Sequence, residues 1–225
     1  MLMPRTARLA IGDTVYHVLN RASGRATIFH NDKDYQHFEA LLSEARELID
    51  MRILAYTLMP NHWHLVLYPK NDGDMSEFMR WLTTTHVRQR RVATKSVGHG
   101  PLYQGAYKSF IVQEDKHLVD LIRYVEQNPL RASLVRRAED WQWGSLWWRL
   151  KSTTQQKKLL EQLPTTLPSN YLISVNEVCN NNTLDRIRSS VARSAPYGAE
   201  EWVAHMVEEH HLEGTVRPPG RPKKG

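Results

Sequence analysis

Residues 52–68, RILAYTLMPNHWHLVLY, decide the fold of this chain. Two apolar runs flank a tight Met-Pro-Asn connection, which predicts a β-hairpin with strands at about 52–58 and 62–68. The second strand opens on His62 and His64. Because successive side chains of a strand alternate between its faces, both histidines point to the same face. Two imidazoles side by side make half of a metal site.

The segments on both sides of the hairpin predict a strand–helix–strand–strand–helix–strand–helix order. Besides the hairpin, the expected elements are a strand at 14–19, a helix capped by Asn31 or Asp32 and running to about 50, a helix at about 75–93, a strand at 107–112 and a helix from Asp115. This order is that of an α+β ferredoxin-like sandwich, with a central antiparallel sheet and helices on one face. We expect the other face to stay free for a substrate.

Residues 118–129, LVDLIRYVEQNP, carry a second group of polar side chains. If this segment is a helix that Pro129 ends, Tyr124 and Asn128 lie four residues apart on one helix face. A histidine pair, a phenol and an amide together suggest phosphodiester chemistry. Taken singly, each has a simpler explanation: the histidines as polar decoration, Tyr124 as core, and Asn128 as a helix stop.

Composition limits the class of protein. The chain has 225 residues, of which 41% are hydrophobic, enough for a substantial core. Its one cysteine, Cys179, excludes a disulfide framework and a cysteine-rich zinc site, which fits a reducing compartment. We find no apolar stretch of membrane-spanning length and no signal-peptide core. We therefore expect a soluble, cytoplasmic protein with no membrane partner.

Basic residues are concentrated in one part of the chain. The net charge is +6, and no acidic residue occurs between Glu77 and Glu114. Basic and large aromatic residues alternate in that interval: Arg80, Trp81, Arg88, Arg90, Arg91, Lys95, Tyr103, Tyr107 and Lys108. Cations for phosphates interleaved with rings for bases suggest nucleic-acid binding, and the alternative is a solvated helix face.

The composition changes near residue 150. We predict one domain over 1–150, closed by a tryptophan-rich helix near 141–148, followed by an extension over 151–225. Residues 180–182, three asparagines, show no periodicity, so we expect a mobile linker or loose packing there, then a short helix near 199–211. The ending RPPGRPKK is similar to an AT-hook that could lay Arg221 in a minor groove. A disordered solubilising tail is the alternative.

Two segments resemble a known family. Residues 59–66, MPNHWHLV, resemble the His-hydrophobic-His signature of HUH single-strand DNA nucleases. Residues 124–132, YVEQNPLRA, resemble the tyrosine segment of REP-associated tyrosine transposases. Shorter matches in the same order extend the resemblance over about residues 14–148. It assigns 1–150 as a single-tyrosine nuclease domain and 151–225 as a linker and DNA-binding extension.

The resemblance implies a single-stranded DNA endonuclease and transposase. Tyr124 would be the nucleophile and form a 5′-phosphotyrosine, while His62, His64 and Asn128 would hold Mg²⁺ or Mn²⁺, the donor set suiting Mn²⁺ better. The implied partner is a palindromic hairpin with a single-stranded flank, bound at the bacterial nucleoid by a chain that we expect to be a monomer. Candidate DNA contacts are Arg21, Arg25, Arg80, Arg88, Arg90, Arg91, Lys108 and Arg221 for phosphates, and Tyr103, Gln104 and Tyr107 for bases.

Two other functions remain open. A histidine-triad nucleotide hydrolase also carries alternating histidines in a strand, but it needs a third histidine at position 66, which is Val66 here. A catalytically silent hairpin-binding regulator would keep the same fold. The presence of the tyrosine and all three candidate ligands argues against loss of activity.

Overall fold

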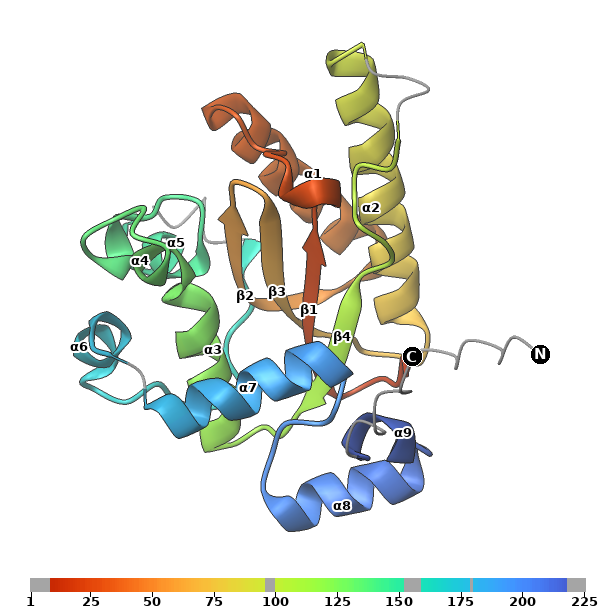
Figure 1. Ribbon diagram of the computed structural model, residues 1–225, viewed down its shortest axis with the longest axis vertical. Helices are drawn as coiled ribbons and strands as arrows, with labels where there is room; N and C mark the ends of the chain where they lie inside the picture. The colour runs from red at the N-terminus through yellow and green to blue at the C-terminus, as the bar shows by residue number, and fades with distance from the viewer. Residues whose placement is uncertain (1–8, 96–99, 152–158, 179, 218–225) are drawn as a thin grey trace, which may run out of the picture.

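The computed structural model describes residues 9–95, 100–151, 159–178 and 180–217. A four-stranded antiparallel sheet with the order β2-β3-β1-β4 lies at its centre (Figure 1). The strands are β1 (Val15–Arg21), β2 (Arg52–Met59), β3 (His62–Tyr68) and β4 (Lys108–Val112). Each predicted strand is present, and the β2–β3 connection is tight, as expected.

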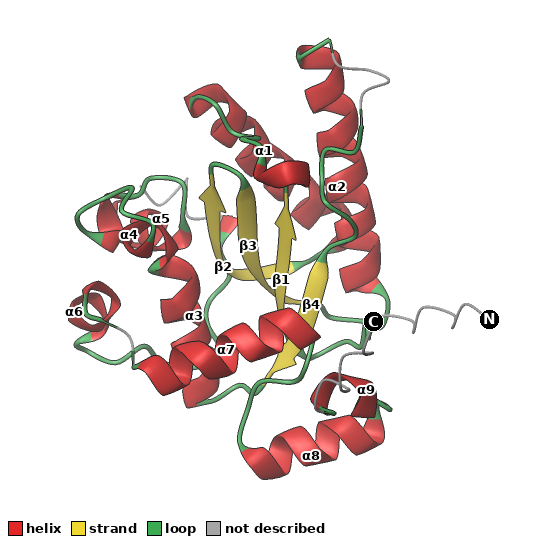
Figure 2. Ribbon diagram, in the orientation of Figure 1, coloured by secondary structure: helices red, strands yellow, loops and turns green. Residues whose placement is uncertain are grey.

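Two long helices cover one face of the sheet (Figure 2). They are α1 (Asp32–Ile49), whose N-terminus is capped by the Asn31 side chain, and α2 (Asp74–Ala93). Alternate strand residues such as Tyr16, Val18 and Trp63 point into this layer and are buried. This arrangement confirms the α+β ferredoxin-like sandwich.

The opposite face of the sheet is partly covered as well. Helix α3 (Lys116–Glu126) and helix α7 (Asn181–Arg193) pack there against Val66 and Phe110, with Leu121 and Ile187 fully buried between them. The expectation that this face stays free is therefore wrong over the area that α3 and α7 occupy. Sequence periodicity shows that a helix has an apolar side, but not which sheet face receives it.

Pro129 does not end the tyrosine helix. Helix α3 ends at Glu126, and a short helix, α4 (Asn128–Arg131), follows with Pro129 in its first turn. A first-turn proline is tolerated because the N–H group it lacks would have no partner within the helix. The prediction of one helix running to Pro129 is corrected to two, with Asn128 at the start of the second.

The C-terminal part of the described chain is more ordered than its composition suggests. Its elements are η2 (Ala138–Asp140), α5 (Ser145–Lys151), α6 (Tyr171–Asn176), α7, α8 (Glu200–Glu209) and α9 (Glu213–Val216); a further 3₁₀ turn, η1 (Ser23–Arg25), follows β1. The asparagines predicted to be aperiodic linker instead begin α7, where the Asn180 side chain accepts a hydrogen bond from the Asn182 amide. The division at residue 151 stays a prediction.

The tryptophans near residue 145 contribute to the core. Trp143 is 7% exposed and stacks on Tyr35 with ring centroids 4.9 Å apart. The Trp141 indole N–H donates to the Leu58 carbonyl, which ties this segment to β2. The packing role predicted for the tryptophans is confirmed for Trp141, Trp143 and Trp148, which lie in the core or pack against it. None of the described helices has the length and apolar composition needed to cross a lipid bilayer.

The packing of α7 predicts a large cost for truncating its buried side chain. Ile187→Ala removes a fully buried side chain and should lower the free energy of unfolding by about 2–5 kcal/mol, measured by urea denaturation. The control Ile173→Ala, on a side chain that is 62% exposed, should change it by less than about 0.5 kcal/mol. Equal effects of the two substitutions would show that α7 does not belong to the folded unit.

Candidate active site

His62 and His64 lie on the sheet face that α3 covers. His62 is half-buried and His64 is buried, and their ring centroids are 5.1 Å apart. The antiparallel register places Arg21 opposite His62 and Leu19 opposite His64. The histidine pair therefore sits where β1 ends and β3 begins, beside a basic side chain.

A second group holds each histidine ring. The His62 Nδ1–H donates to Asn61 Oδ1 at 2.6 Å, and His64 Nδ1 is 2.9 Å from Nε2 of the buried His17. If His64 donates in the second bond, both histidines carry their proton on Nδ1 and keep the Nε2 lone pair for a ligand. Such partners fix the tautomer and orientation of metal-binding histidines.

Burial keeps these imidazoles uncharged. It lowers the pKa of His17 to about 3, and burial together with the nearby Arg21 charge lowers the pKa of His62 to about 4. The pKa of His64 is also lowered, chiefly by burial and then by neighbouring cationic groups. All three rings are neutral near pH 7. The neutral imidazole is the form that binds a metal ion.

Tyr124 of α3 lies against the histidines of the same chain. Its ring meets those of His64 and His17 edge-on, at centroid distances of 5.9 and 6.3 Å. Thr57 Oγ1 of β2 donates to the carbonyl of Val125 at 2.9 Å, which holds the C-terminal turn of α3 against the sheet.

The end of α3 is also held in place through the buried carboxylate of its last residue, Glu126. Glu126 accepts 2.6 Å hydrogen bonds from the Ser145 and Tyr171 hydroxyls and pairs with the Arg149 guanidinium. Its side chain is fully buried, so removing any of these donors would weaken the compensation of its charge. Helices α5 and α6 thereby fix the end of the helix that carries Tyr124.

Asn128 lies close to Tyr124, but its oxygen already has a partner. Its amide nitrogen donates to the Tyr124 carbonyl at 3.0 Å, and its Oδ1 accepts from Arg131 Nη2 at 2.9 Å. The Arg131 guanidinium carbon lies 4.3 Å from the centroid of the Tyr124 ring. Tyr124 and Asn128 thus lie together, as predicted, and the Arg131 guanidinium contacts both.

The residues fit a divalent cation in part. Two neutral imidazoles suit Mn²⁺ better than Mg²⁺, which prefers oxygen ligands, whereas the Asn128 oxygen faces a guanidinium. Across the residues that the structure describes, no group of three or more His, Cys, Asp or Glu side chains is placed to hold a metal ion. A cation at His62 and His64 would need the amide and water as further ligands.

Most of the predicted DNA contacts line two adjoining cavities. One, of about 370 Å³, is lined by Arg21, Gln104 and Lys108, and Arg21 is the β1 residue paired with His62 of β3. The other, of about 710 Å³, lies between α2 and the loop before β4 and includes Arg88 and Arg91 among its lining residues. Both cavities share Asn20, Gly105 and Ala106, and the larger one also contains Tyr103 and Tyr107. Arg25 and Arg80 are exposed away from both linings, and Arg221 lies outside the described residues.

Two of the predicted DNA contacts have structural roles instead. Tyr103 is only 6% exposed, and its hydroxyl accepts from Trp63 Nε1 at 3.0 Å and lies 2.6 Å from His86 Nδ1. A base cannot stack on a ring enclosed in this way. Arg90 forms a 2.7 Å ion pair with Asp34 that joins α2 to α1. Both assignments are corrected, because sequence shows residue type but not burial.

The sequence of this chain matches a family of known proteins. The family described as Transposase IS200 like matches residues 10–128, which include the histidines and Tyr124. The chain belongs to the IS200-like transposase family. A curated Haemophilus influenzae protein described as a REP-associated tyrosine transposase is 22% identical over 121 residues, covering 50% of this chain and 69% of that protein.

A solved structure shows the same fold. It is that of a REP-associated tyrosine transposase bound to a REP hairpin, with a TM-score of 0.53 and 19% sequence identity. The match covers 64% of this chain and 82% of the other. The similarity therefore leaves about a third of this transposase-family chain unmatched.

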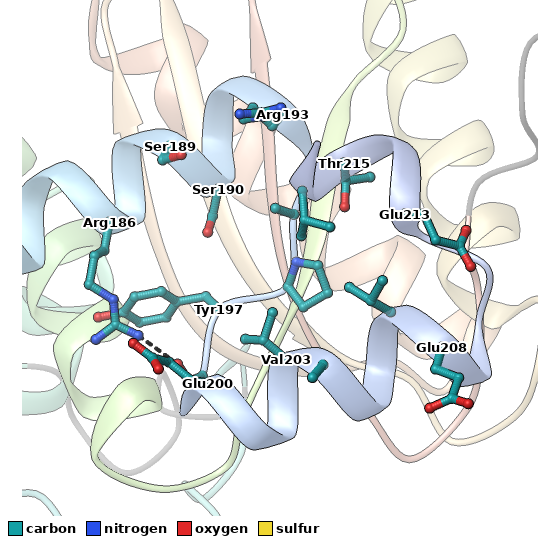
Figure 3. Close-up of a pocket in the computed structure, with 16 residues that line it drawn as sticks. Arg186, Ser189, Ser190, Arg193, Tyr197, Glu200, Val203, Glu208, Glu213 and Thr215 are labelled. Atoms are coloured by element: carbon teal, nitrogen blue, oxygen red, sulfur yellow. Dashed lines mark hydrogen bonds between the residues drawn. The ribbon is translucent and has the colours of Figure 1, made fainter. Parts of the chain in front are cut away.

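A larger groove lies away from these residues. It has a volume of about 750 Å³ and lies between α7 and the α8–α9 pair, with Val203 and Tyr197 among its lining (Figure 3). Arg186 spans one end and donates to the Gly198 carbonyl at 2.6 Å. None of the predicted site residues within the described ranges lines it. Cavity size alone would therefore have pointed away from the histidines.

Sequence reasoning missed His17 and Arg131. His17 was detectable in principle, since strand alternation over 15–19 places it on one face with Leu19, but its contact with His64 depends on the β1–β3 register. Arg131 lies within the tyrosine motif, yet only the α3–α4 break turns it back over Tyr124.

The His17–His64 hydrogen bond predicts a role in metal binding. His17→Phe keeps a ring in the core but removes the partner of His64 Nδ1, and should weaken Mn²⁺ binding about 10–100-fold, measured by electron paramagnetic resonance titration. His17→Gln, whose amide can accept the same hydrogen bond, should recover most of the affinity. Equal Mn²⁺ affinity of the wild type and the Phe variant would show that the hydrogen bond has no such role.

Proposed function

We propose that this chain is a single-stranded DNA endonuclease and transposase that binds palindromic REP hairpin DNA and cleaves it through Tyr124 with a divalent metal. The observation that carries the proposal is the edge-on contact of the Tyr124 ring with His64 of the same chain. This contact brings a phenol beside the neutral imidazole of His64, which lies beside that of His62, and the Nδ1 atoms of both histidines are already engaged. Membership of the IS200-like transposase family supports the same reaction class.

The reaction is a transesterification. The Tyr124 oxygen forms a bond to phosphorus, and the bond from phosphorus to the 3′-oxygen breaks, leaving a 5′-phosphotyrosine. The phenolic proton passes to solvent, and the departing 3′-oxygen takes up a proton to become a hydroxyl. The phosphotyrosine bond keeps the energy of the cut bond, so the 3′-hydroxyl can attack it and rejoin DNA.

The chain's own residues address the two difficulties of this step. A phenol is a weak nucleophile at neutral pH, and phosphodiester oxygens repel an incoming oxyanion. The buried contacts of α3 hold Tyr124 in one position, which reduces the entropic cost of attack. A divalent cation, Mg²⁺ or Mn²⁺, held by His62, His64 and Asn128 would supply charge neutralisation at a non-bridging oxygen.

The two adjoining cavities are the proposed DNA-binding surface. Arg21, Lys108 and Arg88 provide cations for phosphates, and Tyr107 provides a half-buried ring. The similarity to a transposase solved with a REP hairpin supports this class of substrate. We propose that the cavity beside Arg21 contacts the single-stranded flank and that the basic lining of the α2 cavity contacts phosphates of the hairpin. One chain supplies both surfaces and the nucleophile, so we expect an active monomer.

A catalytically silent hairpin-binding protein of the same fold is the second candidate. It would use the same cavities but have no need of a tyrosine held against histidines. The contact between Tyr124 and His64 favours the active enzyme. Assay of labelled single-stranded hairpin DNA with Mn²⁺, followed by a denaturing gel, separates the two, because only the enzyme forms a covalent adduct.

Tyr124→Phe should abolish adduct formation. The substitution removes only the attacking oxygen, so hairpin affinity, measured by fluorescence anisotropy, should stay within a few-fold of the wild type. A Phe variant that still forms the adduct would show that another residue is the nucleophile. The same affinity measurement is the control for folding, because a misfolded variant would not bind the hairpin.

His62→Ala and His64→Ala should each remove metal-dependent cleavage. Asn128→Ala should reduce it less, because water can replace an amide ligand and the Asn128 oxygen is shared with Arg131. Single-turnover cleavage across a Mn²⁺ titration measures both effects. Equal cleavage with and without a chelator would contradict the proposed metal site.

Arg88→Ala combined with Arg91→Ala should weaken hairpin binding and reduce its salt dependence. Each lost phosphate contact should flatten the slope of log affinity against log salt by about 0.7–0.9. Arg90→Ala is the matched control. Because Arg90 pairs with Asp34, this substitution should leave the slope unchanged. An unchanged slope in the double variant would show that the α2 cavity does not contact DNA.

A further inference from the structure

Arg131 lies where three parts of the site meet. Its guanidinium carbon is 4.3 Å from the Tyr124 ring centroid, and its Nη2 donates to Asn128 Oδ1 at 2.9 Å. The same Tyr124 ring meets the His64 ring edge-on at a centroid distance of 5.9 Å, which connects Arg131 to the histidine pair through Tyr124. A cationic group therefore touches both the proposed nucleophile and a proposed metal ligand.

This placement conflicts with a metal ion at Asn128. The Asn128 oxygen that would bind a cation accepts a hydrogen bond from Arg131 instead. A cation bound to the same oxygen would lie within a few ångströms of the guanidinium, and like charges at that separation repel each other. Arg131 must move away from Asn128 before the amide oxygen can complete a metal site.

A phosphodiester offers Arg131 a better partner than the amide. Guanidinium–phosphate hydrogen bonds are charge-assisted and can be bidentate, and they are about twice as strong as bonds between neutral groups. A phosphate positioned for attack by the Tyr124 oxygen would lie within reach of the long Arg131 side chain, whose guanidinium carbon is 4.3 Å from the ring centroid. Substrate binding can thus draw the guanidinium from Asn128 to the phosphate.

We propose that Arg131 is a further catalytic residue that binds the non-bridging oxygens of the scissile phosphate and, in doing so, releases Asn128 Oδ1 to the metal ion. The inference rests on the proposed function. In the free protein Arg131 keeps the metal site incomplete. In the substrate complex it neutralises charge on the phosphate while the Tyr124 oxygen bonds to phosphorus and the 3′-oxygen leaves.

The first test measures Mn²⁺ binding without DNA by electron paramagnetic resonance. Arg131→Ala should bind Mn²⁺ several-fold more tightly than the wild type, because both the repulsion and the competition for Asn128 are removed. The gain should disappear in the Arg131→Ala/Asn128→Ala double variant. The control Arg136→Ala, on an exposed arginine, should leave the affinity unchanged. Unchanged or weaker binding by Arg131→Ala would overturn the proposed competition.

The second test measures single-turnover adduct formation at saturating hairpin. On a normal phosphodiester, Arg131→Ala should be about 100-fold slower than the wild type, and Arg131→Lys should recover part of the rate. On one methylphosphonate diastereomer at the scissile position, which lacks the charged oxygen, Arg131→Ala should be slowed by less than about 3-fold relative to the wild type. Equal losses on every substrate would overturn the phosphate contact.

The outcomes separate this inference from the proposed function. If the wild type forms an adduct and Arg131→Ala forms it at the same rate, the inference fails and the proposed function stands. If the wild type forms no adduct with any hairpin, both fail. Thermal unfolding midpoints of the Ala and Lys variants within a few degrees of the wild type show that lost activity is not lost folding.

Discussion

The antiparallel register between β1 and β3 is the constraint on which the site depends. It pairs Leu19 with His64 and Arg21 with His62, so the histidines face α3. A slip of one residue would turn them towards α1 and α2 and bring Trp63 into the site. Trp63 opposes that slip because it is fully buried and its indole donates to Tyr103. Packing on the sheet face that α1 and α2 cover thus fixes the orientation of the histidines on the opposite face.

The position of Tyr124, the proposed nucleophile, depends on a part of the chain beyond the family match. That match ends at residue 128, whereas the buried Glu126 is satisfied by Ser145, Arg149 and Tyr171. Without these partners an uncompensated carboxylate would lie two residues from Tyr124. Helices α5 and α6 therefore support the site from outside the sandwich, and buried side chains of α7 pack in the same cluster as those of α3.

Local patterns predicted the elements, and long-range contacts decided the exceptions. The hairpin, α1 and α2 follow from periodicity and from a cap at Asn31, which are properties of neighbouring residues. The break at Pro129 and the burial of Tyr103 depend on packing between segments far apart in the sequence. For the same reason the histidines and Tyr124 were identifiable as residue types, while the partners His17 and Arg131 needed coordinates.

The site of the covalent bond tests the account most directly. Trypsin cleaves after Arg123 and Arg131 and releases residues 124–131, YVEQNPLR, which contain a single tyrosine. Wild-type protein reacted with hairpin DNA and Mn²⁺, then digested with nuclease and trypsin, should show by tandem mass spectrometry a 5′-nucleotide on Tyr124. A nucleotide on any other peptide, or none on any tyrosine, would contradict the account.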